Sequence, residues 1–229
     1  MEHKRILVLA NSFKHHARCI AGRELHSDGS FGPWIRPISS HGEGELLPHE
    51  TQLSTGRQVE VWQYVSVPLD HHANNRFQPE NWLIHGAGNW LDLDASCPAF
   101  SLGMLPECPP DLWNEPGGFP DCVSHRRLQL APPRQSLYVI RPENFRVRVE
   151  SRDGKEKWRA VFRFKSVGYN FSITDPVFLQ KYSAWLRGKT LPSEGPLPCG
   201  DRCLLCVSLG GMWQDKHYKL VATIFENAP

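Results

Sequence analysis

Short runs of apolar residues alternating with polar ones dominate the chain, and they predict a protein built mainly from β-strands. The clearest run covers residues 59–67, where one face carries mostly valine. Similar or wholly apolar runs predict further strands at residues 5–10, 34–38, 136–140, 145–149, 158–164, 169–173, 203–209 and 217–225. Residues 11–24 follow neither period, and we interpret them as a functional loop or a short helix. Many short strands with frequent turns favour β-barrels or sandwiches over an α/β sheet.

Two prolines indicate the position of one strand and the start of one helix. Pro37 interrupts the strand at 34–38, which predicts that this strand lies at a sheet edge. Pro176 suits the first turn of a short helix over residues 176–186, and Asp175 can cap that helix.

A proline-rich segment separates the two halves of the chain. Residues 97–133 contain eight prolines and a Gly-Gly pair, which exclude a central strand or a long helix there. We interpret the segment as a surface excursion that ends near Pro133. The predicted domains are therefore residues 1–133, which carry the excursion, and residues 134–229.

The composition of the chain excludes some classes of protein but does not indicate a function. The 229 residues are 40% hydrophobic and 22% charged, so a core can form without a metal or a disulfide. The net charge of +2 is too small to indicate nucleic-acid binding by itself. No run approaches the roughly 20 apolar residues of a membrane span, and the N-terminal apolar run is too short for a signal peptide. With an odd number of cysteines, seven, we expect a cytoplasmic, reduced protein with no membrane partner.

A hairpin over residues 145–164 is the most informative element. A two-residue turn at Asp153-Gly154 would fix its register. One face then pairs apolar residues across the two strands: Phe145 with Phe162, Val147 with Ala160, and Val149 with Trp158. The other face places Arg148 opposite Arg159, which costs stability because like charges then face each other.

The charge on this second face has two interpretations. Residues 134–165 contain ten Lys or Arg and four Asp or Glu. A basic, twisted sheet face with aromatic residues nearby suits single-stranded nucleic acid. A solvated strand face would also carry Arg and Lys, and the sequence alone favours neither interpretation.

Motifs along the chain resemble the dual OB-containing domain family. In order they are Asn11-Ser12, Arg18-Cys19-Ile20-Ala21-Gly22 with Glu24, Trp34-Ile35-Arg36-Pro37, Gln78-Pro79-Glu80-Asn81, Tyr169 with Ile173-Thr174-Asp175-Pro176, Cys206-Val207-Ser208-Leu209-Gly210 and Tyr218-Lys219-Leu220-Val221-Ala222. The resemblance covers nearly the whole chain apart from the proline-rich segment and the region around Cys199. It implies a mainly β fold of two OB-like β-barrels packed in one unit, with the proline-rich excursion and one or two short helices.

The resemblance also implies a function. The family occurs mainly in prokaryotes, at mobile-element and antiphage loci, where nucleic-acid binding is inferred. It implies a protein that binds DNA or RNA beside a separately encoded nuclease or helicase of a defence system. It supplies no catalytic residue and no cofactor, so we favour binding over catalysis.

Cysteines offer two further chemistries. Cys199, Cys203 and Cys206 have metal-ligand spacing, but a zinc site needs a fourth ligand and no second Cys-x2-Cys pair is present. We therefore predict no metal and interpret Cys206 as a buried residue of a strand. Cys19, with Arg18 and Arg23 close in sequence, could be an activated nucleophile, although burial is the commoner state of such a cysteine.

Three functions remain open. The first is nucleic-acid binding by the residues Arg18, Arg23, Trp34, Arg36, Arg146, Arg148, Arg159, Arg163 and Lys219, with Trp34 expected to be exposed and to stack a base. The second is an enzyme acting on a nucleotide or modified base in a pocket built from residues 11–39 and 78–82, with the candidates Asn11, Ser12, Glu24, Glu80, Asn81 and Asp175. The third is a structural subunit of a defence complex that binds protein through the proline-rich segment.

Overall fold

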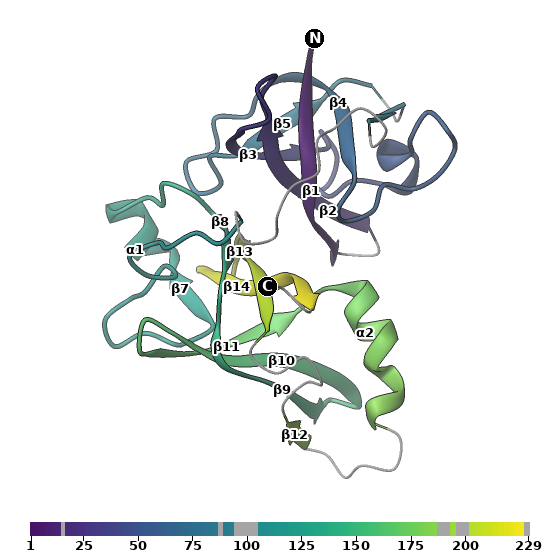
Figure 1. Ribbon diagram of the computed structural model, residues 1–229. Coiled ribbons are helices and arrows are strands. Elements are labelled where there is room, and N and C mark those ends of the chain that lie inside the picture. The colour runs from purple at the N-terminus through teal and green to yellow at the C-terminus, as the bar shows by residue number, and fades with distance from the viewer. Residues whose placement is uncertain (15–16, 87–88, 94–104, 187–192, 196–201, 227–229) are drawn as a thin grey trace. The chain divides into compact units, whose positions relative to one another are not determined.

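The computed structural model describes residues 1–229 except 15–16, 87–88, 94–104, 187–192, 196–201 and 227–229. The chain forms two compact units, one of Met1–Phe100 with Arg134–Ser136 and the other of Ser101–Pro133 with Leu137–Pro229 (Figure 1). The excursion that we assigned to the first domain therefore belongs, from residue 101 onward, to the second unit. Both units are built mainly from β-strands, as the sequence predicts.

A closed barrel of five strands forms the first unit. The long first strand β1 (Glu2–Lys14) pairs with β4 (Tyr64–His72) through its first half and with β2 (Ala17–Leu25) through its second half. From β2 the sheet continues to β3 (Phe31–Ile38), then to β5 (Asn81–Ile84), which runs parallel to β3, and returns to β4. A 3-10 helix (Pro48–Thr51) and the short β6 (Leu91–Asp92) complete the unit. A five-stranded Greek-key barrel of this kind is the OB architecture.

Inward-facing aliphatic side chains fill this barrel. Ile6, Val8, Ile20 and Val65 are all fully buried. A register shift between Val8 and Ala10 lies where β1 passes from one partner strand to the other. Closure of the barrel thus depends on one bent strand that serves two neighbours.

Two sequence predictions for this unit are wrong. Residues 11–14 and 17–24 are not a loop or helix but the end of β1 and most of β2, and residues 15–16 lie outside the described residues. The strand expected over 59–67 begins only at Tyr64, because Trp62 adopts a φ of 76° that no strand tolerates.

The third strand is also not at an edge. It pairs with β2 on one side and with β5 on the other. Pro37 is tolerated because the pairing with β2 ends at Ile35, so no neighbour on that side needs its missing N–H.

The second unit repeats the strand order of the first. Its sheet runs β12 (Ser193–Gly195), β9 (Glu143–Arg152), β10 (Lys155–Phe164), β11 (Val167–Ile173), β14 (Lys216–Glu226), β13 (Cys203–Trp213), β8 (Leu137–Ile140). The β11–β14 pairing is parallel, as is β3–β5 in the first unit. Only two residues separate the end of β8, the last strand of this order, from the start of β9, which lies next to β12 near the other end. Strands β8 and β9 together therefore take the place that β1 has in the first barrel.

The register predicted for the 145–164 hairpin is confirmed over most of its length. Val149 lies opposite Trp158, and Arg148 lies opposite Arg159. Asp153 and Gly154 have φ values of 55° and 71°, which is the two-residue turn that the Asp-Gly pair predicts. The expected pairing of Phe145 with Phe162 falls on a register shift between Val161 and Arg163, beyond which Arg163 lies opposite Glu143. Both phenylalanines are nevertheless buried in the core.

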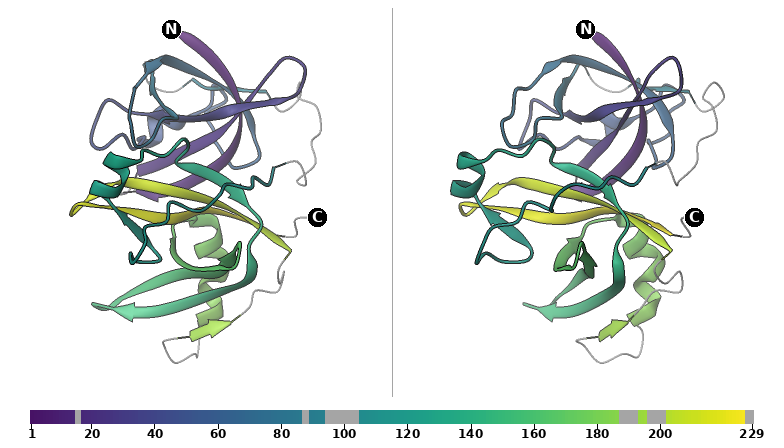
Figure 2. Two further views of the ribbon diagram at one scale, coloured as in Figure 1. Left: turned by 90° about the vertical axis from the view of Figure 1, so that its left-hand side faces the viewer. Right: turned by 60° about the vertical axis from the view of Figure 1, so that its left-hand side comes forward.

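The proline-rich segment contains no long helix or central strand among its described residues. It holds β7 (Cys122–Ser124), which pairs with β14, and the six-residue α1 (His125–Leu130). Figure 2 shows β13 and β14 as a long yellow hairpin whose tip lies beside this teal segment. The His125 N–H donates to the carbonyl of Asp215 at that tip.

The predicted helix is α2 (Pro176–Tyr182), continued by a 3-10 turn at Ser183–Leu186. Asp175 caps it, since Oδ1 accepts from the N–H groups of Val177 and Phe178, each at 3.0 Å. Its Oδ2 accepts from the N–H of Ile224 at 2.9 Å, which ties the helix start to β14. One carboxylate thus serves three backbone donors.

Replacing this cap is expected to destabilise the protein. The Asp175→Ala variant should lower the free energy of unfolding by about 2–4 kcal/mol, because three backbone N–H groups lose their acceptor. Asp175→Asn keeps an oxygen for the helix but presents an amide to Ile224, so its loss should be smaller. Chemical denaturation measures both, and an alanine variant as stable as the natural protein would contradict this account.

Candidate nucleic-acid interface

The structure places the predicted cations of the first barrel in its framework rather than on an open surface. Arg36 is 7% exposed, and its backbone N–H donates to the carbonyl of Glu80. Arg18 donates from Nη1 to Oδ1 of Asn11 at 3.3 Å and lies 4.3 Å from the ring centre of Phe13. Burial lowers the pKa of the Arg18 guanidinium. Arg23 donates from Nε to the carbonyl of Gly32 at 2.7 Å.

The expected base-stacking tryptophan is not exposed. Trp34 is 3% exposed, and the residues that follow it on β3, through Pro37, are buried as well. Its flanking proline and arginine suggested a surface site, but a strand with neighbours on both sides and burial on both faces leaves no room for a base. The prediction that Trp34 is exposed is therefore wrong.

The predicted enzyme pocket is not assembled either. Arg18 and Glu24 lie six residues apart on one strand, a separation of about 20 Å. Glu24 accepts from Nζ of Lys4 at 2.9 Å, and Glu80 accepts from the backbone N–H and, at 2.8 Å, from the hydroxyl of Ser136. The carboxylates of Glu24 and Glu80 thus each bind a different part of the framework and do not face a common pocket.

The remaining pocket candidates have structural surroundings of their own. The amide of Asn11 donates to the carbonyl of Val59 at 2.9 Å, and Ser12 is 7% exposed. The amide of Asn81 donates to Oε1 of Gln78 at 3.2 Å, while its oxygen is buried without a hydrogen-bond partner among the described residues. Asp175 belongs to the second unit, where it caps α2. We find no convergence of these residues on one site.

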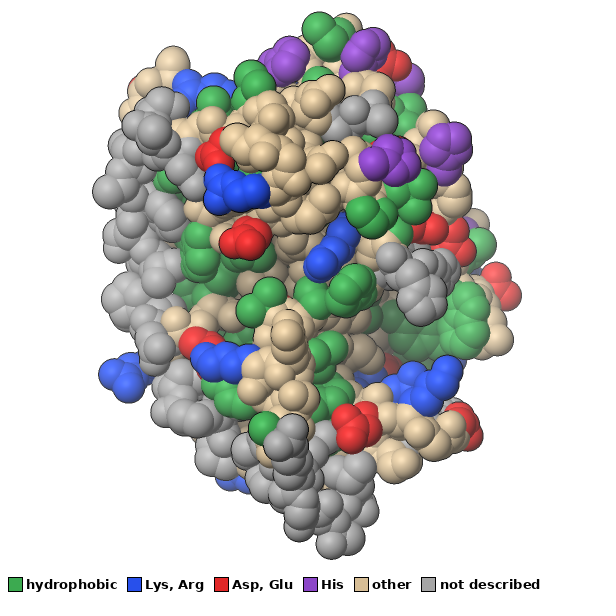
Figure 3. Space-filling model, turned by 90° about the vertical axis from the view of Figure 1, so that its right-hand side faces the viewer, with side chains coloured by type: hydrophobic (Ala, Val, Ile, Leu, Met, Phe, Trp, Pro, Cys, Tyr) green, Lys and Arg blue, Asp and Glu red, His purple; other side chains and the backbone are tan. Residues whose placement is uncertain are grey.

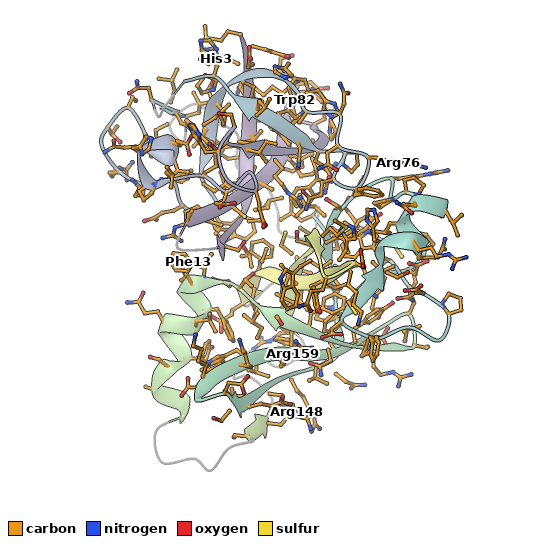
Figure 4. The ribbon with its side chains drawn as sticks, turned by 180° about the vertical axis from the view of Figure 1, so that it is seen from behind. His3, Phe13, Arg76, Trp82, Arg148 and Arg159 are labelled. Atoms are coloured by element: carbon orange, nitrogen blue, oxygen red, sulfur yellow. The ribbon has the colours of Figure 1, made fainter. Side chains whose placement is uncertain are left out.

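In the second barrel the two opposed arginines are each compensated. Arg159 donates to Oδ1 of Asn170, to the hydroxyl of Ser172 and to Oδ2 of Asp121, the last at 2.8 Å, and its side chain is only 18% exposed. Arg148 turns to Glu194, with 3.1 Å between Nε and Oε2. Figure 4 shows both arginines on the sheet of the second unit. The unfavourable facing of like charges is thus relieved by local carboxylates rather than left for a ligand.

Two arginines remain accessible beside these pairs. Arg146 has a 58% exposed side chain and lies 3.9 Å from Glu194, while Arg163 is exposed and donates to the carbonyl of Ser166. Both line a shallow cavity of about 430 Å³ on the outer side of β9, β10 and β11. We call its accessible part, Arg146, Val161, Arg163, Gly168 and Asn170, the open face.

Two aromatic residues of the second unit that were not among the sequence-predicted candidates are exposed. Trp213 is 59% exposed at the end of β13, and Phe119 of the proline-rich segment is 64% exposed. Nζ of Lys216 lies 4.7 Å from the ring centre of Phe119. We call Met212–Lys216 together with Phe119 the hairpin tip. One sequence feature could have indicated this site: Met212-Trp213 stands directly before a Gln-Asp pair that can form a turn. Two large apolar residues at a turn are costly to expose, so their presence there points to a binding surface.

The open face and the hairpin tip occupy the positions where an OB barrel binds its ligands. That surface is formed by the second and third strands and by the loops after the first and fourth strands. In the second unit these are β10, β11 and the turns 153–154 and 214–215. Pro120 and Gly168 border both the open-face cavity and a second cavity, which Phe119 also lines, so the surface is continuous.

Lys219 lies in this second cavity, of about 480 Å³. The side chain is buried, with Nζ 5.7 Å from the ring centre of Tyr169 and 5.9 Å from that of Phe171. Burial lowers the pKa of Lys219 from 10.5 to about 8, against the opposing influence of Cys122 and nearby carboxylates. Its ammonium has no hydrogen-bond or ion-pair partner within the part of the chain that the structure describes.

Charge is mixed rather than concentrated on the face seen in Figure 3. Lys and Arg side chains lie interspersed with Asp and Glu, and histidines gather at the top of the view, over the first unit. The described residues on this face therefore form no continuous basic surface.

The cysteines provide no metal site among the described residues. Cys203 and Cys206 are fully buried on β13, as predicted for Cys206, and Cys199 lies outside the described residues. No three side chains able to ligate a metal come together in the ranges described. In those same ranges, none of the helices has the length and apolar character that crossing a membrane requires.

A comparison with protein-family models finds a match over residues 4–224 to the dual OB-containing domain. No curated protein matches the sequence. The match covers both barrels.

Removing the buried ammonium is expected to stabilise the protein. At pH 7 the Lys219→Met variant should unfold with a free energy higher by about 1–3 kcal/mol, because a charged group no longer has to be buried. The pKa of Lys219 is lower in the folded state than the 10.5 of the unfolded state, so the natural protein gains stability as pH rises from about 8 to 10.5. The advantage of the variant should therefore disappear over that window.

Denaturation at pH 7 and pH 10.5 measures this effect, with Lys216→Met as the control for a more exposed lysine. A Lys219→Met variant that is less stable than the natural protein at pH 7 would show that the ammonium has a stabilising partner.

Proposed function

Because the chain belongs to the dual OB-containing domain family, we propose that it binds single-stranded nucleic acid, and that the second barrel binds it across the open face and the hairpin tip. Dual OB domains point to nucleic-acid binding in general. The assignment to one barrel, one surface and one kind of strand is specific to this proposal.

The exposed aromatic pair at the hairpin tip carries the proposal. Trp213 and Phe119 each expose more than half of their surfaces. Lys216 lies against the ring of Phe119 and opposite Trp213 in the hairpin, and Pro120, next to Phe119, borders the open-face cavity. Such rings stack on bases of any sequence, while the neighbouring cations attract phosphates. By contrast, β3 of the first barrel presents only buried side chains from Trp34 to Pro37.

The number of accessible cations sets the expected electrostatics. Arg146, Arg163 and Lys216 can reach phosphates, whereas Arg159 is committed to Asp121. Three phosphate contacts with a single strand correspond to a salt slope of about −2. Affinity should thus depend on salt moderately rather than steeply.

A cellular role completes the proposal. As the family resemblance implies, we also propose a cytoplasmic protein accessory to a separately encoded nuclease or helicase of a prokaryotic defence system. The proline-rich segment is not favoured as the docking site for such a partner. Leu112 and Trp113 are buried, and Asn114 donates to the hydroxyl of Tyr169 at 3.0 Å, so the segment stabilises the second unit itself.

Removing the two accessible arginines is expected to weaken binding. The Arg146→Gln/Arg163→Gln variant should lose about 25-fold in affinity for oligo(dT) at 0.1 M salt, and its salt slope should fall by about 1.4, because two phosphate contacts are lost. Fluorescence anisotropy at several salt concentrations measures both quantities.

The matched control is Arg57→Gln in the first barrel, where Arg57 is 64% exposed and pairs with Asp92. Equal losses in the two variants would indicate a nonspecific charge effect and contradict the assignment to the open face.

Truncating the exposed tryptophan tests base stacking separately. Trp213→Ala should weaken oligo(dT) binding at least about fivefold with an unchanged salt slope, since stacking contributes about 1–3 kcal/mol per base without involving phosphates. Trp213→Phe should retain most of the affinity, and Leu130→Ala, at a 77% exposed apolar residue of α1, serves as control. An unaltered affinity of Trp213→Ala would remove the hairpin tip from the interface.

A further inference from the structure

The second cavity has a composition that phosphate binding does not explain. Lys219 is 2% exposed, and its ammonium group has neither a hydrogen-bond nor an ion-pair partner among the described residues. A buried, unpartnered charge is costly, and such groups cluster at functional sites. The cavity is therefore a candidate for a ligand of its own.

The other polar groups of the cavity differ in how many of their hydrogen-bonding atoms are available to a ligand. Glu115 is occupied, because its two oxygens accept from the N–H and the hydroxyl of Ser124 at 2.8 and 2.6 Å. Asp111 accepts from the N–H of Asn114 through Oδ1 at 2.9 Å, and no hydrogen bond within the described residues uses Oδ2. Asn114 donates its side-chain amide to Tyr169 and keeps its own oxygen as an acceptor. Lys219 can therefore donate while Asp111 and Asn114 accept.

The charge around the cavity argues against a phosphate. Lys219 and Arg127 supply two positive charges, whereas Asp111 and Glu115 in the lining, and Asp121 beside it, supply three negative ones. An anion would meet as much repulsion as attraction there. A neutral ligand that carries both acceptors and donors fits this mixed lining better.

The walls favour a flat ligand. Phe119, Pro116, Pro120 and Val167 are exposed and contribute apolar surface to the cavity. Aromatic and proline surfaces at the rim suit the face of a planar ring. The volume of about 480 Å³ accommodates one nucleobase with space left for water.

We propose that this cavity holds one unstacked guanine of the bound strand, with its O6 toward Lys219 and its N1–H and N2–H groups toward Asp111. The proposal rests on the proposed function, because the strand on the open face and hairpin tip would deliver the base. Guanine presents an acceptor beside two donors on its Watson–Crick edge, which matches an ammonium beside a carboxylate. Adenine and cytosine place a donor where guanine has O6, and uracil has one donor for Asp111 rather than two.

Free nucleosides test the pocket without phosphates and without the strand-binding surface. Isothermal titration of the full chain with guanosine, adenosine, cytidine and uridine should give at least tenfold tighter binding of guanosine, the discrimination typical of a bidentate base contact. Lys219→Met and Asp111→Asn should each lower guanosine affinity at least tenfold. Arg57→Gln, in the first barrel and outside the pocket, should leave it unchanged.

Several outcomes would overturn the pocket. These are equal binding of the four nucleosides, full retention of guanosine affinity by Lys219→Met, or salt-sensitive preference for guanosine monophosphate over guanosine, which would indicate an anion site. Phe119→Ala, a change at an exposed rim, keeps the test valid if the Asp111 variant fails to fold, and it too should weaken guanosine binding.

The two proposals fail distinguishably. Salt-sensitive oligo(dT) binding without guanosine selectivity would refute only the pocket. Selective guanosine binding without oligonucleotide binding would refute the strand interface and, with it, the delivery of the base by a strand, and would leave a pocket for free guanine compounds.

Discussion

Both barrels depend on one constraint, the parallel pairing of their third and last strands. In the first unit β3 runs beside β5, and in the second β11 runs beside β14. These ladders are short, yet without them the first barrel would open and the sheet of the second unit would divide in two, each time exposing unpaired backbone groups. Closure also decides which side chains face inward, since neighbours along a strand point to opposite faces. It is what buries Val147 and Phe171 while leaving Arg146 and Arg163 outside.

How far the sequence could predict this fold differs between the two barrels. The hairpin of β9 and β10 was predictable because its Asp-Gly turn and its clean alternation are local properties. Residues 11–24 were not, because β2 is buried at Ile20, Ala21 and Gly22 in succession and so lacks a period of two. A Cβ at Gly22 would lie 2.2 Å from the carbonyl oxygen of Leu7, so this glycine permits the close approach of β1 and β2 rather than a turn.

The candidate site was predictable only in part, for a related reason. Arg146 and Arg163 could be assigned to an outer face from strand alternation alone. The burial of Trp34, and the commitment of Arg159 to an aspartate 38 residues earlier, depend on chain segments that meet only in the folded state. Trp213 directly precedes a two-residue turn formed by Gln214 and Asp215, which both have positive φ. Because neither turn residue is a glycine, the sequence does not mark the turn clearly. The alternation of residues along a strand therefore predicts which charged side chains face outward better than it predicts which aromatic rings are exposed.

The central claim is that the second barrel carries the nucleic-acid interface. Ultraviolet cross-linking of a bound thymidine-rich oligonucleotide, followed by mass spectrometry of the modified peptides, locates the contact directly. Adducts should fall on the peptides that contain Trp213, Phe119 and the β10–β11 strands. Adducts confined to peptides of the first barrel would contradict the account and shift attention to the surface of β1 and β2.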